Sequence, residues 1–239
     1  MNKMKILSWN VHYDVTDAKK QHLEELKKEE GFDLLILQEC TPKGFDLLKN
    51  DWKHSILYAD TLYENKANYG IAVFSNDYEL RFTENFNRNF RYILSFEVWK
   101  DKSFLFYLFA VWTKTVPFSY SKNVLKALQF EGYQKYIADK ALFIGDFNTP
   151  TTPQNQVEYD ALQTAGLINC AAPEDVLKPT YSHKETVDYF TADYCFATEQ
   201  MKASYTIQEK LLDLDDSIAG KDKYKGLSDH VPVIVEIEL

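Results

Sequence analysis

One segment combines an apolar run with an abrupt polar end: Ala141-Leu142-Phe143-Ile144-Gly145-Asp146-Phe147-Asn148-Thr149-Pro150. The apolar part has no polar break, which is typical of a buried strand, and Pro150 stops the pattern. Because side chains alternate between the two faces of a strand, Asp146 and Asn148 point the same way. A carboxylate beside an amide suits a base that activates water next to a donor to an anionic group. Residues of these types also form turns, and the segment alone leaves both interpretations open.

The composition indicates one globular domain. The chain has 239 residues and no linker rich in Pro, Gly or Ser, so we expect a single domain over residues 1–239. Its 16 Tyr, 16 Phe and 4 Trp can fill a large core without disulfides. The cysteines Cys40, Cys170 and Cys195 are too widely spaced for a zinc site or a disulfide scaffold, which indicates a reduced interior.

Charge and hydropathy limit the classes of partner that the protein is expected to bind. The net charge is −9, from 27 basic and 36 acidic residues, and this argues against a basic face for long nucleic acid while leaving short or metal-bridged phosphate substrates open. No apolar run is long enough to span a bilayer, and no leader peptide is evident at the first residues. We therefore expect a monomer in the cytoplasm, unless the sequence is a mature form whose leader was removed.

The order of strands and helices predicts an α/β fold with two sheets. The expected strands are Lys5–His12, Asp33–Cys40, His54–Ala59, Tyr69–Phe74, Tyr92–Trp99, Ser103–Thr113, the Ala141 segment, Asp193–Ala197, Tyr205–Gln208 and Val231–Leu239. The expected helices are Asp17 to Gly31, Pro42–Asn50, Ser121–Ala138 and Val157–Thr164. Paired strands without a helix between them recur in the middle of the chain, which argues against an all-parallel sheet. Two mixed sheets packed face to face, with helices outside, fit this order better.

Polar residues follow several of these strands where each strand ends. The ends are Trp9-Asn10, Gln38-Glu39, Gly145-Asp146-Phe147-Asn148, Ala192-Asp193-Tyr194 and Ser228-Asp229-His230. Together they predict a rim rich in carboxylates with one imidazole, and such hard oxygen ligands favour Mg²⁺ or Mn²⁺ over Zn²⁺. Taken singly, each could be a capped strand end, and a lone histidine before a strand is more often structural.

These motifs, in this order, resemble those of the endonuclease/exonuclease/phosphatase superfamily. The matching segments are Ser8-Trp9-Asn10, Leu37-Gln38-Glu39, Gly145-Asp146-Phe147-Asn148, Asp193-Tyr194 and Ser228-Asp229-His230-Val231-Pro232. They run from the first strand to the last, so the resemblance covers the whole chain. It implies a DNase I-like four-layer α-β-β-α sandwich and metal-dependent cleavage of a phosphoester bond.

The resemblance also implies a metal site. Glu39 resembles the main Mg²⁺ ligand of the family, with Asn10 beside it and Asp229 close to the metal. His12 lies where some relatives carry a second acidic ligand, which argues against a second metal ion in this chain. An ordinary turn would explain Asn10 if Glu39 and Asp146 were not present.

The remaining motif residues resemble the catalytic groups of the family. Asp146 resembles the group that orients or deprotonates the attacking water, and Asn148 resembles the amide that holds the phosphate. His230 resembles the imidazole that stabilises the transition state, and Asp193 resembles the carboxylate that pairs with this histidine. The scheme is physically coherent, because a metal ion and an imidazolium neutralise charge on the phosphoryl oxygens while a carboxylate aligns water.

The sequence departs from the family at the end of the central strand. Many relatives carry His or Tyr there, whereas this chain has Ala110-Val111-Trp112-Thr113. Trp112 has one N–H that can bind a phosphate oxygen, or its ring can stack on a base, and packing in the core is an equal alternative. Arg91 or Arg88 is a candidate for the missing phosphate contact, although each arginine alone fits a solvated connection.

We therefore expect a Mg²⁺-dependent phosphodiesterase of nuclease type, acting on short or damaged nucleic acid. A phosphomonoesterase acting on a sugar or inositol phosphate is the enzymatic alternative, and a noncatalytic phosphate-binding domain is the alternative from another class. Substrate choice is expected to depend on the segments 65–68, 115–120 and 210–226, because fold and metal chemistry are shared within such a family.

Overall fold

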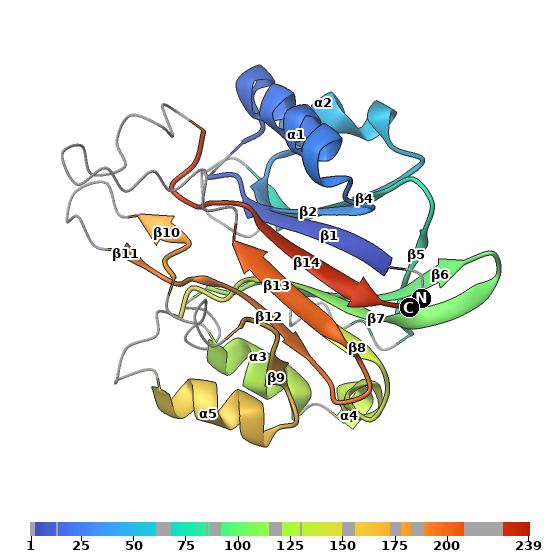
Figure 1. Cartoon of the computed structure of the whole chain (residues 1–239), viewed down its shortest axis with the longest axis vertical. Coiled ribbons are helices and arrows are strands. Elements are labelled where there is room, and N and C mark those ends of the chain that lie inside the picture. Colours follow the sequence, from blue (N-terminus) through green and yellow to red (C-terminus); the bar gives the residue numbers. More distant parts are fainter. Residues whose placement is uncertain are drawn as a thin grey trace.

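The computed structural model describes residues 3–12, 14–60, 68–84, 86, 92–114, 121–129, 131–149, 156–172, 178–182, 189–207 and 227–239. These residues form two sheets of six strands and one of two strands. The two large sheets face each other, with α1 and α2 covering one outer side and α3, α4 and α5 covering the other (Figure 1). The predicted four-layer α-β-β-α sandwich is therefore confirmed.

The first large sheet contains both ends of the described chain. Its order is β13-β14-β1-β2-β4-β3. The strands are β1 (Lys3–Asn10), β2 (Leu34–Cys40), β3 (His54–Asp60), β4 (Tyr69–Ser75), β13 (Ala203–Ile207) and β14 (Val233–Glu238). β1 is parallel to β2 and antiparallel to β14, so the sheet is mixed. Parallel pairing brings the ends of β1 and β2 to the same edge of the sheet.

The second large sheet has the order β5-β6-β7-β8-β12-β9. The strands are β5 (Glu79–Phe82), β6 (Ile93–Lys100), β7 (Ser103–Trp112), β8 (Ala141–Asp146), β9 (Ile168–Asn169) and β12 (Asp193–Ala197). β7 and β8 are parallel, with Trp112 opposite Asp146, and β12 runs back along β8 with Asp193 opposite Asp146. The end of β8 therefore lies between the end of β7 and the start of β12.

The helices begin and end at recognisable signals. α1 (Asp17–Glu30) begins where the Thr16 side chain accepts a hydrogen bond from the backbone N–H of Lys19, and it ends at Gly31 with a φ of 67°. The other helices are α2 (Pro42–Leu48), the 3₁₀ turn η1 (Lys49–Asp51), α3 (Ser121–Leu128), α4 (Glu131–Ile137) and α5 (Gln156–Thr164). No helix among these described residues is both long and apolar enough to cross a membrane.

The prediction of one helix from Ser121 to Ala138 is wrong. The segment forms two helices, α3 and α4. On one continuous helix Tyr133 would be about two and a half turns after Val124, and so on the opposite face. Both side chains are fully buried in the same apolar cluster against the second sheet. The break between α3 and α4 allows both residues to face that sheet.

Short strands were not predicted either. β5 and β9 at the sheet edges and the hairpin of β10 (Tyr181–Ser182) and β11 (Tyr189–Phe190) have two to four residues each. Segments of this length are too short to show a hydrophobic period. Their pairing is decided by contacts with strands that are distant in the sequence.

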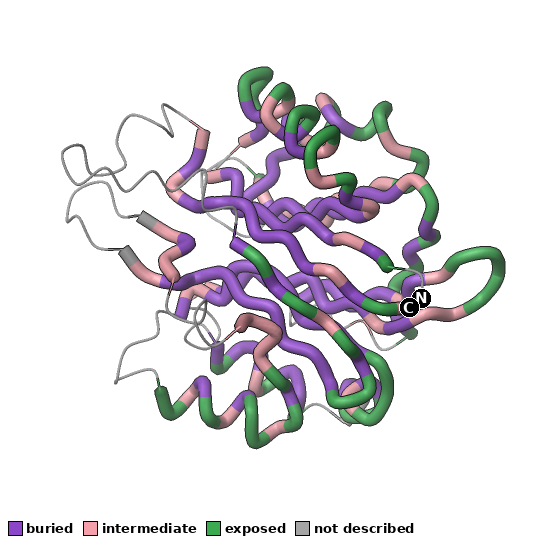
Figure 2. Tube along the Cα trace, viewed as in Figure 1, coloured by how far each residue is buried: buried purple, intermediate pink, exposed green. Residues whose placement is uncertain are grey.

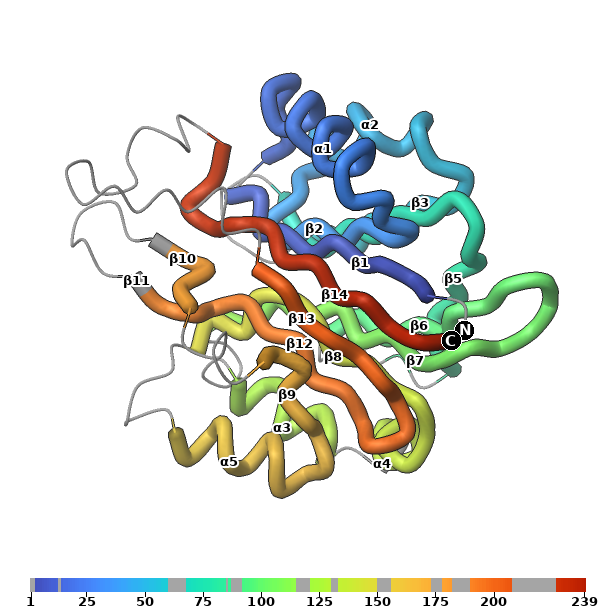
Figure 3. Tube along the Cα trace, viewed as in Figure 1, coloured from blue at the N-terminus to red at the C-terminus, as the bar shows by residue number. Residues whose placement is uncertain are grey.

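Apolar layers hold the sandwich together. One layer lies between the two sheets, and each sheet has one further layer between it and its own helices. Figure 2 shows the strands as a continuous buried interior with exposed residues on the outer helices. The two chain ends lie side by side, and Figure 3 places them at the end of the molecule opposite the hairpin of β10 and β11. The strand ends that carry Asn10 and Asp193 lie at the hairpin end.

Candidate active site

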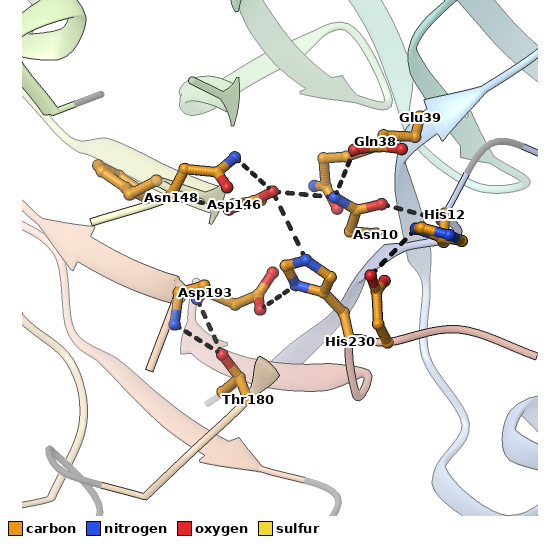
Figure 4. A network of polar contacts seen from close by, with 12 residues as sticks. Asn10, His12, Gln38, Glu39, Asp146, Asn148, Thr180, Asp193 and His230 are labelled. Carbon is orange, nitrogen blue, oxygen red and sulfur yellow. Dashed lines mark hydrogen bonds and ion pairs between the residues drawn. The ribbon is translucent and has the colours of Figure 1, made fainter. Parts of the chain in front are cut away.

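Five strand ends converge between the two sheets. β1 brings Asn10, β2 brings Glu39, β8 brings Asp146, β12 begins at Asp193, and His230 precedes β14. These side chains point toward one another in Figure 4, where dashed lines connect them into one network. All of them are buried. The structure therefore brings together the motif residues that the sequence predicts at a shared rim.

Asp146 and Asn148 form the centre of this network. The Asn148 side-chain amide donates to Oδ2 of Asp146 at 2.8 Å, and the backbone N–H of Asn148 donates to Oδ1 at 2.8 Å. The same amide also donates to the backbone oxygen of Thr113 at 2.9 Å. Asn148 adopts a φ of 47°, a left-handed conformation that asparagine tolerates better than most residues. The two side chains lie side by side, but β8 ends at Asp146, so the left-handed turn at Asn148 rather than strand alternation brings them together. Asn148 holds the Asp146 carboxylate in place.

Gly145 allows the sheets to approach each other next to Asp146. Its φ is 142°, and a Cβ atom built on it would lie 2.0 Å from the Val111 oxygen and 3.0 Å from the Gln38 side-chain nitrogen. Any larger residue would clash with β7 and strain the backbone. The glycine before Asp146 is therefore needed for close packing at the site.

His230 lies between two carboxylates. Its Nδ1 is 2.8 Å from Oδ2 of Asp193, and its Nε2 is 3.9 Å from Oδ2 of Asp146. The backbone of His230 is also fixed, because its N–H donates to Ser228 Oγ at 3.1 Å and its oxygen accepts from the Trp9 indole at 2.9 Å. The imidazole is thus held in one orientation with each nitrogen facing a different acid.

Asp193 is positioned from behind by two residues that the sequence did not reveal. Thr180 Oγ1 accepts hydrogen bonds from the backbone N–H groups of Ala192 and Asp193 at 2.9 and 3.0 Å. The Tyr205 hydroxyl donates to the backbone oxygen of Asp193 at 2.9 Å. Neither Thr180 nor Tyr205 lies near Asp193 in the sequence. Only the pairing of distant strands could have identified them.

Burial and charge shift the pKa values of this group. Burial alone lowers the pKa of His230, but the carboxylates of Asp193 and Asp146 outweigh it and raise the value to about 10. Burial raises the pKa of Asp146 to about 7, although the charge of His230 opposes this effect. His230 is therefore an imidazolium at neutral pH, while Asp146 exchanges a proton near neutral pH. That combination suits an acid–base pair in which each group has its own role.

Asn10 connects Asp146 to a second pair of acids. Its amide donates to Asp146 Oδ2 at 2.9 Å and lies 3.3 Å from Glu39 Oε1. Glu39 has a φ of 59° at a register shift between β2 and β4, which turns its side chain into the site. Asn10 Oδ1 accepts the backbone N–H of His12, whose Nδ1 pairs with Asp229 Oδ2 at 3.1 Å. The row of polar groups thus runs from His230 to Glu39 and Asp229.

Two sets of side-chain atoms at the site are suitable ligands for a cation. Asp146, Asp193 and His230 each offer an atom within 4.8 Å of the others. Separately, Oε2 of Glu39 and Oδ1 of Asp229 are buried and have no hydrogen-bond partner among the described residues. Buried acceptors without a partner are costly, and carboxylate oxygens are preferred ligands of hard divalent cations. The residues that the sequence predicts as metal ligands therefore fit such an ion.

The structure places Trp112 in the core, which is one of the alternatives that the sequence left open. Trp112 is almost fully buried and packs against Tyr69 and Tyr92, with ring centroids at 5.4 and 5.8 Å. Its indole N–H has no partner within the described part of the chain. Arg91 lies outside the described residues, as do Arg88, 65–67, 115–120 and 210–226 of the expected rims. Arg81 is exposed and pairs with Glu79.

One cation at the site was missed by the sequence analysis. Lys114 Nζ is 3.6 Å from Glu39 Oε1 and 4.0 Å from the centre of the Trp112 ring. The sequence does contain a hint of this position. Residues two apart near a strand end tend to share a face, and Lys114 follows Trp112 by two residues.

A separate groove of about 870 Å³ lies between α3, α4 and α5, and none of the site residues lines it.

Comparisons with known proteins agree with this architecture. No protein-family model and no curated protein matches the chain. Solved structures do match it over its full length. An endonuclease/exonuclease/phosphatase protein from Bacteroides vulgatus is 15% identical, with a TM-score of 0.69 and coverage of 100% of both chains.

Two further structures have more specific descriptions. The mannosyl-6-phosphatase of Bacteroides thetaiotaomicron VPI-5482 is 13% identical, with a TM-score of 0.65, over 99% of this chain and 100% of its own. The 3′-5′ exonuclease of Neisseria meningitidis is 16% identical, with a TM-score of 0.64, over 99% of this chain and 100% of its own. At these identities the likeness establishes the fold. The fold that the predicted resemblance implies is therefore the fold of these structures.

Proposed function

We propose that this chain, which has the fold of the endonuclease/exonuclease/phosphatase structures, hydrolyses a phosphoester bond with the help of a divalent cation. The proposed substrate is a phosphodiester in short or damaged nucleic acid. One observation carries the proposal: the two ring nitrogens of His230 face two different buried carboxylates, Asp193 and Asp146. In this arrangement the imidazolium can stabilise negative charge while the Asp146 carboxylate acts as a separate base.

Asp146 is the proposed base. Its Oδ2 accepts hydrogen bonds from the amides of Asn10 and Asn148, which fix the carboxylate without protonating it. Its raised pKa, about 7, makes it a better proton acceptor than an ordinary aspartate. A water molecule next to Asp146 would therefore lose a proton to this carboxylate as it attacks phosphorus.

His230 is the proposed electrostatic group. As an imidazolium it donates from Nε2 to an oxygen of the phosphoryl group, while Asp193 holds Nδ1–H and keeps the ring charged. Asn148 is proposed to hold the phosphate as well. Both of its amide hydrogens are engaged with Asp146 and Thr113 in this structure, so that contact requires one of these bonds to be exchanged.

Glu39 and Asp229 are the proposed ligands of a Mg²⁺ or Mn²⁺ ion, with Asn10 beside them. Their unpartnered buried oxygens support this choice. The group of Asp146, Asp193 and His230 is less suitable, because Nδ1 of His230 already binds Asp193 and the ring is protonated. When bound, the ion would supply a Lewis acid that neutralises charge on the phosphoryl oxygens.

Hydrolysis of bis-p-nitrophenyl phosphate and p-nitrophenyl phosphate, compared with Mg²⁺, Mn²⁺ or EDTA, tests the function. We expect metal-dependent cleavage of the diester, lost by about 10²-fold or more in Asp146→Asn. The matched control is Asp160→Asn, an exposed aspartate on α5 outside the site. Preference for the monoester would support a sugar or inositol phosphatase instead. Metal binding without any turnover would indicate a noncatalytic phosphate-binding domain.

A further inference from the structure

Lys114 places a second cation at the site, and the scheme above does not use it. Its ammonium lies 3.6 Å from Glu39 Oε1, 4.0 Å from the Trp112 ring centre and 5.7 Å from the Tyr69 ring centre. The Lys114 side chain is 23% exposed and that of Glu39 is 11% exposed. The lysine is therefore partly shielded by aromatic rings but still partly open to solvent.

The main chain around Lys114 is fixed by buried groups. The Asn123 amide donates to the Lys114 oxygen at 2.7 Å, and Asn123 is 3% exposed. The Asn148 amide donates to the Thr113 oxygen at 2.9 Å, and Thr113 is fully buried. Asn148 also binds Asp146, so the backbone that carries Lys114 is tied to the proposed base. A lysine on such a fixed backbone presents its charge in a defined place.

The ammonium has unused donor capacity. A lysine offers three N–H donors, and the distance to Glu39 is longer than a normal hydrogen bond. Aromatic faces attract the charge but accept no full hydrogen bond. Within the described part of the chain, Lys114 has no other polar contact for its ammonium. The ammonium therefore forms an ion pair with Glu39 and contacts two aromatic rings, and it keeps N–H donors for a further anionic ligand.

The polar row therefore has a cation at each end. His230 contacts Asp146, Lys114 contacts Glu39, and Asn10 bridges the two acids. A phosphate bound over this row meets the imidazolium on one side and the ammonium on the other. The row contains four carboxylates (Glu39, Asp146, Asp193 and Asp229) and two cations, so with all four acids ionised one divalent ion would make the group neutral before substrate binds.

We propose that Lys114 contacts the substrate, that it donates to a nonbridging oxygen of the phosphate, and that it shifts the selectivity of the site toward phosphate monoesters relative to diesters. The proposal rests on the proposed phosphoesterase function. Its physical basis is charge, since a monoester phosphate is a dianion at neutral pH and a diester is a monoanion. A fixed ammonium is attracted about twice as strongly to the dianion at the same distance.

Calorimetry with inorganic phosphate tests the contact without turnover. Wild type, Lys114→Gln and Lys114→Arg are titrated with phosphate at a Mg²⁺ concentration that saturates each variant. We expect Lys114→Gln to bind phosphate about 10- to 100-fold more weakly, as for loss of a hydrogen bond to a charged group. Lys114→Arg keeps the charge and should recover part of the affinity. An unchanged phosphate affinity in Lys114→Gln would overturn the proposal.

Kinetics with the two nitrophenyl esters test the selectivity. In Lys114→Gln we expect kcat/KM to fall about tenfold more for the monoester than for the diester. The control is Lys122→Gln, which removes an exposed lysine that also pairs with a glutamate, Glu158, at 3.2 Å. Equal losses on both esters, or a change in Mg²⁺ affinity alone, would show that Lys114 serves only as a counter-ion of Glu39.

The two proposals fail in different ways. If wild type hydrolyses neither ester, the proposed function is wrong, while phosphate binding still decides whether Lys114 contacts the anion. If wild type hydrolyses an ester and Lys114→Gln keeps the wild-type ratio of monoester to diester, the function stands and the role of Lys114 is wrong. Thermal melting of each variant confirms that the fold is kept.

Discussion

Nδ1 of His230 lies 2.8 Å from Oδ2 of Asp193, although the two residues are 37 positions apart in the chain. β12 brings the acid and the segment just before β14 brings the imidazole, so the pair joins the two facing sheets. Because both side chains are buried, the contact is shielded from solvent and holds the ring as a cation. The same contact would therefore serve both the stability of the fold and the proposed catalysis.

Asp193→Asn should change how stability depends on pH. The pKa of His230 is about 10 in the folded protein and 6.5 in its ordinary state, so its stabilising effect is complete below about pH 6.5 and is lost as the pH rises to about 10. The amide removes the charge that raises this pKa. We expect the difference in unfolding free energy between wild type and Asp193→Asn to be largest near pH 6.5 and to shrink toward pH 10, where the imidazole of the folded protein loses its proton. Urea denaturation of the metal-free proteins measures it, and a difference that grows over this pH range would contradict the pairing.

Asp146 should take up a proton near neutral pH when no metal is bound. Burial raises its pKa to about 7, so its carboxyl signal in ¹³C NMR should titrate far above the ordinary value of 3.8. The signal is assigned by its absence in Asp146→Asn. Added Mg²⁺ should move the midpoint down, because a nearby cation favours the ionised form. A carboxyl that stays ionised to its ordinary pKa would rule out the proposed base.

Glu39→Gln should weaken Mg²⁺ binding more than it weakens folding. The variant keeps the shape of the side chain but removes the charge on the unpartnered buried oxygen. We expect a loss of about 10- to 100-fold in metal affinity by calorimetry, with little change in melting temperature. Glu24→Gln on the exposed side of α1 is the control. Equal Mg²⁺ affinity in Glu39→Gln and wild type would contradict the role of Glu39 as a ligand and would favour the group of Asp146, Asp193 and His230 as the metal site.

Gly145→Ala should destabilise the protein by about 2 kcal/mol or more, because the new Cβ would lie 2.0 Å from the Val111 oxygen and the φ of 142° is strained for alanine. Gly31→Ala is a matched control with a positive φ of 67° and nothing within 4 Å, and it should cost about 1 kcal/mol. Chemical denaturation measures both. Equal costs would mean that β7 moves away from residue 145 without penalty.

Local patterns predicted much of the fold and of the candidate site. The long strands carry clear hydrophobic runs, and polar residues follow several of them, as at Asn10 and Asp146. Parallel pairing of neighbouring strands then places such ends together. The resemblance of the motif order to a known superfamily added the layer arrangement, which the structure confirms.

The contacts that depend on tertiary structure could not be predicted in the same way. Thr180 supports Asp193 from a hairpin whose strands are too short to show a pattern. The break between α3 and α4 lets Tyr133 and Val124 pack in the same apolar cluster, whereas the sequence period alone suggested one helix. Lys114 meets Glu39 only because β2 and β7 lie in sheets that face each other.

The pairing of Lys3 with Glu238 has a mechanical consequence. β1 and β14 are antiparallel and their outer ends lie at the same end of the molecule (Figure 1). Force applied through residues 3 and 238 would thus unzip the ladder one hydrogen bond at a time, rather than shear all of its bonds together. The ladder would open from the pair Lys3 and Glu238 toward the pair Ser8 and Val233, so the strand ends beside the candidate site would be the last part of it to separate.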